Sequence, residues 1–261
     1  MNRSNRPVAL VTGASSGIGA AMARELARLG HDLVLVARRR EPMEVLAAEL
    51  CGLGANATVM PVDLEVIDRA EALAAELAEA GTEVDVLVNN AGLGAIGRFV
   101  AIDPGRHSEI LQVNIVALTE LTQALLPGML ARGRGRIILV ASTASFLPCP
   151  KMAVYAASKA YVRSFGEALA QELRGTGVTV NVLCPGTTET NFFAVAGSLP
   201  SPLQKMRMMS AEAVARIGCA GMRRGRTVTI AGWRNRLLAF AATHTPHWLT
   251  VPAVERTMTQ E

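Results

Sequence analysis

The chain has 261 residues, of which half are hydrophobic and 18% are charged, so it can build one large core and is not a disordered protein. Its net charge of +4 is small, and its arginine clusters carry no interleaved aromatic residues, which excludes a dedicated nucleic-acid-binding protein. The four cysteines have neither metal-binding nor disulfide-framework spacing. We therefore expect a cytoplasmic protein with free thiols, no metal site and no membrane-spanning segment.

Seven short apolar runs predict the strands of a sheet. They are rich in Val, Ile and Leu with little polar alternation, which is typical of parallel strands buried on both faces. Longer helical patterns lie between them, and this order predicts an α/β fold with one Rossmann-type, doubly wound parallel sheet and helices on both faces. The predicted strands are Val8–Thr12, Asp32–Ala37, Ala57–Val62, Val84–Asn89, Gly135–Ala141, Val178–Leu183 and Thr227–Ile230. The predicted helices are Gly17–Leu29, Pro42–Leu53, Glu65–Ala80, Pro104–Leu130 and Ala153–Arg174.

We expect residues 1–261 to form a single domain. Two of its segments depart from the alternation of strands and helices. The connection from Pro185 to Gln204 is long for this alternation. We expect the segment at about 186–210, which contains most of it, to act as a mobile lid. The extension at about 233–261 is apolar and basic. Three interpretations of it stay open: it covers a pocket, contacts another subunit, or touches a membrane surface.

A glycine-rich turn, TGASSGIG over residues 12–19, follows the first strand and leads into a helix. Gly13 permits a tight turn, Gly17 presents no Cβ to an approaching phosphate, and Gly19 lets the helix pack closely. The start of the helix offers unpaired N–H groups and a partial positive charge. The pattern predicts a dinucleotide site that also includes Ser15, Ser16 and Ile18.

Further motifs follow the turn in a fixed order: Asn89-Asn90-Ala91-Gly92, Asn114, Ser142, Tyr155-Ala156-Ala157-Ser158-Lys159 and Pro185-Gly186. Together with TGASSGIG, they resemble the signature of the short-chain dehydrogenase/reductase family and span most of the chain. The resemblance implies a Rossmann-fold oxidoreductase that moves hydride between a nicotinamide cofactor and a carbonyl or secondary alcohol. It also implies a homodimer or homotetramer.

Four residues form the predicted catalytic set. Tyr155 and Lys159 lie a turn apart on one helix face. A free tyrosine has a pKa of about 10, and a nearby ammonium lowers it, so the pair suits proton transfer. Ser142 follows the fifth strand, and the resemblance implies that it binds the substrate carbonyl while Tyr155 moves the proton and Lys159 contacts the nicotinamide ribose. Asn114 would hold a water linked to Lys159; alternatively, it bonds to its own helix backbone.

The end of the second strand indicates which cofactor is bound. An acidic residue there would bind the ribose hydroxyls of NAD, but Ala37 occupies this position, and Arg38 and Arg39 follow. An arginine can bind a 2′-phosphate through paired hydrogen bonds, so we expect NADP(H) rather than NAD(H), with a solvated basic loop as the alternative. Asp63 and Leu64 resemble the family's adenine contact, and Asp63 can also cap the next helix.

The resemblance alone assigns the remaining positions. Those expected on the adenosine side of the cofactor are Asn90, Ala91 and Gly92. Those expected around the nicotinamide carboxamide are Pro185, Gly186, Thr188 and Thr190, of which Thr190 has the family's spacing. Apolar residues at the expected substrate side favour a hydrophobic ketone, aldehyde or secondary alcohol: Leu93, Gly94, Phe146, Leu147, Cys149, Met152, Phe192 and Phe193.

Two other functions fit the same fold. One is a non-catalytic NADP(H)-binding sensor or scaffold protein, and the other is an enzyme that uses the cofactor for epimerisation or dehydration. Non-catalytic members usually lack a catalytic residue, whereas all four positions are filled here. This favours an enzyme with a small-molecule substrate and no nucleic-acid partner.

Overall fold

Seven parallel strands form the centre of the protein, which a computed structural model describes over residues 6–197 and 208–258. Their order is β3-β2-β1-β4-β5-β6-β7, so the direction of winding reverses between β1 and β4. This order confirms the predicted Rossmann-type α/β fold. The strands are β1 (Val8–Thr12), β2 (Asp32–Ala37), β3 (Ala57–Pro61), β4 (Val84–Asn89), β5 (Gly135–Val140), β6 (Val178–Cys184) and β7 (Val228–Ile230).

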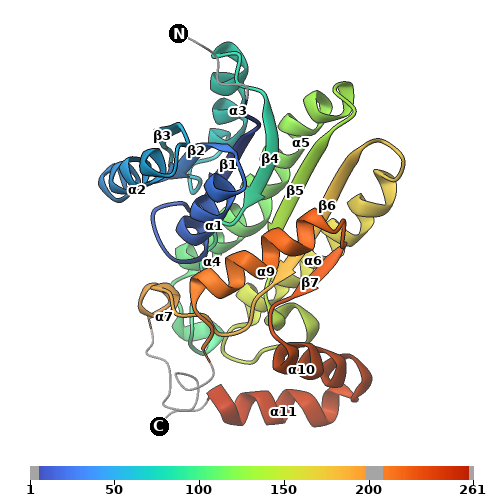
Figure 1. The fold of residues 1–261 in the computed structure, drawn as a ribbon. Coiled ribbons are helices and arrows are strands. Elements are labelled where there is room, and N and C mark those ends of the chain that lie inside the picture. The colour runs from blue at the N-terminus through green and yellow to red at the C-terminus, as the bar shows by residue number, and fades with distance from the viewer. Residues whose placement is uncertain (1–5, 198–207, 259–261) are drawn as a thin grey trace.

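Helices cover both faces of the sheet (Figure 1). One face is covered by α1 (Gly17–Arg28), α2 (Arg40–Gly52) and α9 (Ala211–Arg223). The other is covered by α3 (Arg69–Glu79), α5 (Ala117–Ala131) and α6 (Ala153–Glu172). The other elements are α4 (Pro104–Leu111), the π-helical turn η2 (Gln112–Val116), the 3-10 turns η1 (Phe99–Ala101) and η3 (Thr143–Phe146), α7 (Phe192–Val195), α10 (Trp233–His244) and α11 (His247–Met258).

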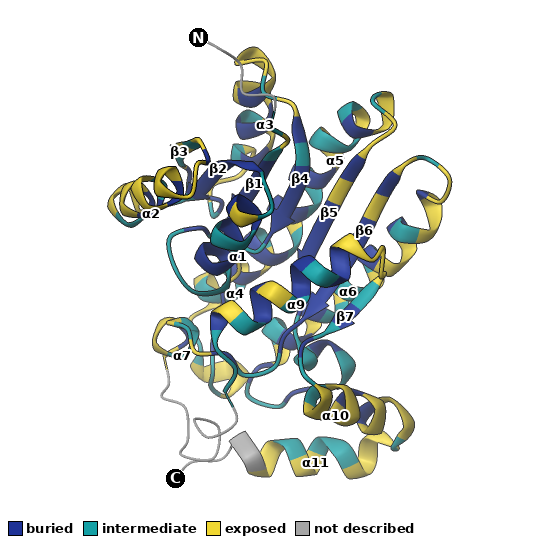
Figure 2. Cartoon of the chain, in the orientation of Figure 1, coloured by how far each residue is buried: buried dark blue, intermediate teal, exposed yellow. Residues whose placement is uncertain are grey.

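Each strand sends alternate side chains into two different cores. Along β2, Leu33 and Leu35 pack with α1, α2 and α9, whereas Val34 and Val36 pack with the helices of the opposite face. All four are at most 3% exposed, and Figure 2 shows the central strands as buried. Because both faces are removed from water, apolar residues are favoured at every position, which explains the lack of polar alternation.

The start of α3 differs from its prediction. The helix begins at Arg69 rather than Glu65. The carboxylate of Asp63 accepts a hydrogen bond from the Glu65 N–H at 3.0 Å and so closes a turn. Asp68, just before the helix, has a φ of 61°, in the left-handed region. The predicted role of Asp63 as a helix cap is therefore wrong: it caps a turn.

The helix predicted over Pro104–Leu130 is interrupted. Asn114 lies in the π-helical turn η2 between α4 and α5, a type of insertion often found at functional sites. Contrary to expectation, the stretch Pro104–Ala131 has the length and composition of a membrane span, and it is the one such helix within residues 6–197 and 208–258. However, α5 packs against α3 and β4 in the core, as a core helix of a globular fold does.

The sequence patterns do not predict α9, α10 or α11. In α9, a Cβ added to Gly218 would lie 2.7 Å from Leu183 Cδ2, and one added to Gly221 would overlap the side chain of Thr229. These glycines weaken the helical pattern, yet the close approach of α9 to β6 and β7 requires them. Helices α10 and α11 form the C-terminal extension below the sheet (Figure 1), where α10 contacts β7 and η3.

Candidate active site

A cleft of about 500 Å³ opens at the carboxyl ends of the strands, where folds of this class bind ligands. Its walls come from the loops that follow β1 to β6, and they bring most of the predicted site residues together. Two of those residues, Gly19 and Asn114, are not part of its lining. The predicted residues that line it are Gly13, Ser15, Ser16, Gly17, Ile18, Arg38, Arg39, Asp63, Leu64, Asn90, Ala91, Gly92, Ser142, Tyr155, Lys159, Pro185, Gly186, Thr188 and Thr190.

The glycine-rich turn forms one wall of the cleft and fits a pyrophosphate. Gly13 and Gly17 have φ values of 66° and 55°, in the left-handed region that favours glycine. A Cβ on Gly19 would overlap the carbonyl oxygen of Gly13, so this position must be glycine for α1 to close on the turn. Ser16 precedes α1 and makes no side-chain cap, which leaves the first N–H groups of the helix available to an anion.

The loop after β4 is fastened to this turn. The Thr12 hydroxyl accepts hydrogen bonds from the N–H groups of Asn90 and Ala91, both at 2.9 Å. In return, Asn90 Nδ2 donates to the Thr12 carbonyl at 2.9 Å. Asn90 therefore maintains the shape of the glycine turn, and Thr12, which the sequence analysis left unassigned, organises both loops.

Ser142, Tyr155 and Lys159 meet at one end of the cleft, between β5 and α6. The Ser142 hydroxyl accepts a hydrogen bond from the Ala144 N–H at 3.1 Å and also hydrogen-bonds to Tyr155. Lys159 is only 4% exposed; it donates to the Val140 carbonyl at 2.8 Å, and its Nζ lies 5.9 Å from the centre of the Tyr155 ring. An ammonium has three donors, so this geometry leaves capacity to bind hydroxyls of a ligand.

Burial shifts both titratable groups towards their neutral forms. It raises the pKa of Tyr155 to about 12, although the hydrogen bond with Ser142 acts in the lowering direction. It lowers the pKa of Lys159 to about 8. The direction for Tyr155 is opposite to the one expected from the nearby ammonium, because desolvation is the larger effect. At neutral pH, Tyr155 is therefore a protonated phenol and Lys159 is mostly an ammonium.

Asn114 lies behind the cleft and holds its loops together. Its Oδ1 accepts from the Leu93 N–H at 2.8 Å, while its Nδ2 donates to the Leu93 carbonyl at 3.0 Å and to Ser158 Oγ at 2.9 Å. The side chain does not bond to its own helix, so that alternative is wrong. Both Nδ2 protons are thus used by protein partners, whereas Oδ1 accepts one hydrogen bond and keeps a second lone pair for a water linked to Lys159.

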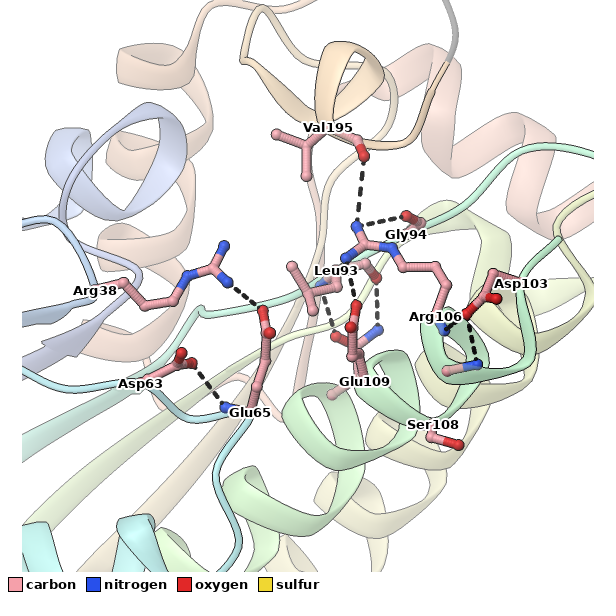
Figure 3. A network of polar contacts seen from close by, with 12 residues as sticks. Arg38, Asp63, Glu65, Leu93, Gly94, Asp103, Arg106, Ser108, Glu109 and Val195 are labelled. Carbon is pink, nitrogen blue, oxygen red and sulfur yellow. Dashed lines mark hydrogen bonds and ion pairs between the residues drawn. The ribbon is translucent and has the colours of Figure 1, made fainter.

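At the other end of the cleft, Arg38 is already paired with a carboxylate (Figure 3). Its guanidinium forms an ion pair with Glu65, which also lines the cleft. Burial raises the pKa of Glu65, and the Arg38 charge opposes this rise. The loop after β3 thus supplies the acidic group that is missing from the end of β2. A ligand phosphate would compete with Glu65 for Arg38.

The two threonine candidates after β6 differ in how their hydroxyls are used. Thr188 is 6% exposed and donates its proton to the Gly186 carbonyl at 3.0 Å. Thr190 Oγ1 accepts from the Phe192 N–H at 3.3 Å, and the Thr190 side chain packs beside Gly17. The described contacts therefore leave the Thr190 proton available, which favours Thr190 as the donor to a ligand.

The predicted lid is described as far as residue 197 and again from residue 208, and residues 198–207 lie outside the described part. Phe192 of α7 packs on Tyr155 with ring centres 5.1 Å apart. Arg106 of α4 donates to the carbonyls of Gly94, at 3.1 Å, and Val195, at 3.4 Å (Figure 3). This arginine ties α7 to the loop after β4, beside Tyr155.

An apolar cluster of Cys149, Met152 and Ala156 lies against Tyr155 and Phe192. Val254 of α11 packs against the same cluster, so the extension contacts the apolar residues beside Tyr155. Burial raises the pKa of Cys149 to about 11, which keeps the thiol neutral. Four residues predicted for the substrate side do not line the cleft itself: Gly94, Phe146, Leu147 and Cys149.

Several cleft residues were not identified from the sequence. Thr187 lies just beyond the Pro185-Gly186 motif, and Ala144 follows Ser142, so extending each motif by two residues would have found both. Glu65 and Arg106 belong to no motif, because each acts through a partner distant in sequence. The lining residues without a predicted role include Val36, Val62, Glu65, Val113, Val140, Ala141, Thr143, Ala144, Thr187, Asn191 and Val195.

The chain is similar to proteins of a known enzyme family. The profile of the short chain dehydrogenase family matches residues 7–198. The chain belongs to this family. It is 35% identical over 193 residues to the ketoacyl reductase HetN of Nostoc sp., covering 74% of this chain and 67% of that protein.

Solved structures of family members agree with the fold and hold nicotinamide cofactors. The short-chain dehydrogenase of Sphingobium yanoikuyae, in complex with NADPH, is 33% identical with a TM-score of 0.79, over 90% of this chain and 92% of that one. A short-chain dehydrogenase/reductase of Burkholderia phymatum, in complex with NAD, is 26% identical with a TM-score of 0.81, over 92% and 94%. Members of the family thus use either cofactor.

Proposed function

We propose that this short-chain dehydrogenase is an NADP(H)-dependent oxidoreductase that reduces a hydrophobic ketone or aldehyde, or oxidises the corresponding alcohol. The observation that carries the proposal is the joining of Ser142 and Tyr155 by a hydrogen bond at the end of the cleft, above the buried ammonium of Lys159. The glycine turn and the free start of α1 at the opposite wall suit the pyrophosphate of the cofactor.

Each group has a defined part in carbonyl reduction. The Ser142 hydroxyl donates a hydrogen bond to the carbonyl oxygen and holds it beside Tyr155. Tyr155, a phenol at neutral pH, gives its proton to that oxygen, and the charge of Lys159 stabilises the phenolate that remains. The nicotinamide, when bound, supplies the hydride that the carbonyl carbon receives. Alcohol oxidation is the reverse.

The preference for NADP(H) rests on Arg38. Its position at the end of β2, with Ala37 in place of an acidic residue, supports recognition of a 2′-phosphate. The Arg38–Glu65 pair means that the phosphate has to displace a carboxylate. Titration with NADPH and NADH tests the preference, and equal or tighter binding of NADH would refute it.

The substrate class and the assembly belong to the same proposal. The apolar cluster beside Tyr155 supports a hydrophobic substrate. Exposed apolar residues on α4, η2 and α5 support a homodimer or homotetramer: Leu111, Val116 and Leu130. A non-catalytic sensor is not proposed, because the groups for proton transfer line the cleft. An epimerase or dehydratase could use the same groups, and it differs by showing no net consumption of NADPH.

Tyr155→Phe tests the proposed chemistry. The variant keeps the ring that packs on Phe192 but lacks the transferable proton, so turnover should fall by at least two orders of magnitude. NADPH binding should remain nearly unchanged. The matched control is Tyr161→Phe, since Tyr161 is the only other tyrosine and hydrogen-bonds to Thr119 away from the cleft. Consumption of NADPH is measured over aliphatic, aromatic, steroid and acyl-thioester ketones. Substantial activity of Tyr155→Phe would refute the assignment.

A further inference from the structure

The two helices of the C-terminal extension expose an unusual amount of apolar surface. We call the outward side of α10 and α11 the extension surface. Figure 2 shows both helices largely exposed, whereas the central strands of the sheet are buried. The large apolar residues of the extension surface, with their exposed fractions, are Trp233 (64%), Leu237 (61%), Leu238 (59%), Phe240 (62%), Trp248 (74%) and Leu249 (48%).

These residues lie opposite the side by which α10 is attached. Ala239 and Ala242 are buried against the protein, so the inward side of α10 is narrow and made of small residues. Trp233, Leu237 and Phe240 recur at spacings of four and three residues, which places them together on the opposite side. A helix exposed to water normally shows its polar side outward, so the apolar side of α10 needs a covering partner.

The charge of the extension surface is mainly positive, because α10 and α11 carry Arg234, Arg236 and Arg256 against one acidic residue, Glu255. The sequence has no acidic residue from Ala213 to Val254, while Arg234 and Arg236 flank the apolar side of α10. The Arg234 guanidinium lies over the Trp233 ring at 5.4 Å. The surface therefore combines tryptophans, apolar side chains and an excess of cations over the single carboxylate of Glu255.

This charge argues against a second copy of the chain as the covering partner. A two-fold symmetric contact brings the same patch of both subunits together. Arg234 and Arg236 would then meet their own copies, with Glu255 as the one acidic residue of α10 and α11 to pair with them. Like charges in a desolvated contact are costly.

We propose that the extension surface binds the interface of a membrane that contains anionic lipids. Helices that lie in such an interface bury Trp, Phe and Leu among the upper acyl chains and place Arg near the headgroups, which is the residue pattern on α10. The complementary charge of the headgroups balances Arg234 and Arg236.

The location of the surface gives this contact a role in substrate access, a step that also rests on the proposed function. On its inner side, α11 contributes Val254 to the apolar cluster beside Tyr155. Asn235 of α10 packs against Gly186 in the loop after β6, where a Cβ would lie 2.5 Å from Asn235 Nδ2. The membrane-facing helices thus form part of the substrate side, and a hydrophobic carbonyl dissolved in lipid would reach Tyr155 between them.

The test uses the chain's own fluorescence, because its only two tryptophans, Trp233 and Trp248, both lie on the extension surface. The full chain is mixed with vesicles of phosphatidylcholine, with or without phosphatidylglycerol, and binding is followed by tryptophan emission and co-sedimentation. We expect a blue shift and binding with the anionic vesicles. Arg234→Gln with Arg236→Gln should weaken this binding about thirtyfold, or about 2 kcal/mol. Leu237→Gln with Phe240→Gln should remove the blue shift.

The control for the apolar variant is Val45→Gln with Ile67→Gln, which changes two exposed apolar residues far from the extension and should bind like the wild type. Unchanged NADPH binding shows that each variant is folded. The proposal is overturned if neither vesicle binds, if phosphatidylcholine alone binds as well, or if Leu237→Gln with Phe240→Gln dissociates an oligomer, since a second copy would then cover the surface. Vesicle binding and oligomeric state are measured without turnover. A failure of the proposed activity is therefore distinguished from a failure of the membrane proposal.

Discussion

The buried ammonium of Lys159 should reduce the stability of the protein at neutral pH, and Lys159→Met should reveal this cost. The pKa of Lys159 falls from 10.5 to about 8 because the side chain is removed from water. At 1.36 kcal/mol per unit, this fall corresponds to about 3 kcal/mol. Below pH 8 the lysine is charged in both states, and the folded state carries the full cost. Between about pH 8 and 10.5 the unfolded chain binds more protons, so stability rises with pH.

The assay is the free energy of unfolding without cofactor, measured by urea denaturation from pH 7 to pH 10.5 for wild type and variant. Loss of the hydrogen bond to the Val140 carbonyl adds a constant offset to the variant, so the change with pH isolates the charge. We expect wild-type stability minus variant stability to increase by about 3 kcal/mol from pH 8 to pH 10.5.

Tyr155→Phe provides a control of opposite sign. The pKa of Tyr155 is raised from 10.0 to about 12, so its contribution is fully present below pH 10 and is lost as the pH rises towards 12. The difference between wild type and Tyr155→Phe should therefore stay flat from pH 7 to about pH 9.5 and fall above it. A flat difference for Lys159→Met over the same measurements would refute the claim that this ammonium is poorly solvated.

Three further changes test other contacts of the site. Glu65→Gln releases Arg38 from its ion pair and should tighten NADPH binding about two- to fivefold, with little change for NADH; weaker NADPH binding would show that Glu65 positions Arg38 instead. Gly19→Ala places a Cβ on the Gly13 carbonyl and should weaken both cofactors at least tenfold by calorimetry, whereas Gly52→Ala, with open space around it, should not. Arg106→Met loses the hydrogen bonds to the Gly94 and Val195 carbonyls, so it should raise the KM for the carbonyl substrate several-fold without affecting NADPH binding. The control is Arg69→Met, which loses only a surface ion pair with Glu76. Equal effects of the two variants would contradict a role of the Arg106–Val195 contact.

The sheet and the main site were predictable because their signals are local. A strand buried on both faces shows an unbroken apolar run, and parallel strands place the residues after their ends at one edge. Ser142 and Asn90 could therefore be placed near each other without knowing any contact. The glycine turn was recognisable because only glycine tolerates the φ of Gly13 and the packing of Gly19.

The features that were missed depend on tertiary contacts. Glycine lowers helix propensity, so the sequence gives little sign of α9, although the close contact with Thr229 requires Gly221. The π-helical turn around Asn114 and the pairing of Arg38 with Glu65 leave no pattern in a single sequence, since each is decided by a neighbour from another element. The same holds for Arg106, whose partner Val195 lies on α7 in the predicted lid segment.

The direction of the Tyr155 pKa shift has a consequence for the chemistry. The four-residue spacing of Tyr155 and Lys159 suggested that the ammonium of Lys159 favours the phenolate. Residue spacing, however, does not show how deeply the two side chains are buried. Desolvation disfavours the charged form of both groups, and it raises one pKa while it lowers the other. At neutral pH the pair therefore consists of a protonated acid beside a cation, which is the state required to give a proton to a carbonyl oxygen. In the opposite direction, alcohol oxidation first needs Tyr155 to lose that proton. Under the proposed function, we therefore expect reductive turnover to dominate at neutral pH and oxidative turnover to increase as the pH rises, which the pH dependence of the two rates measures.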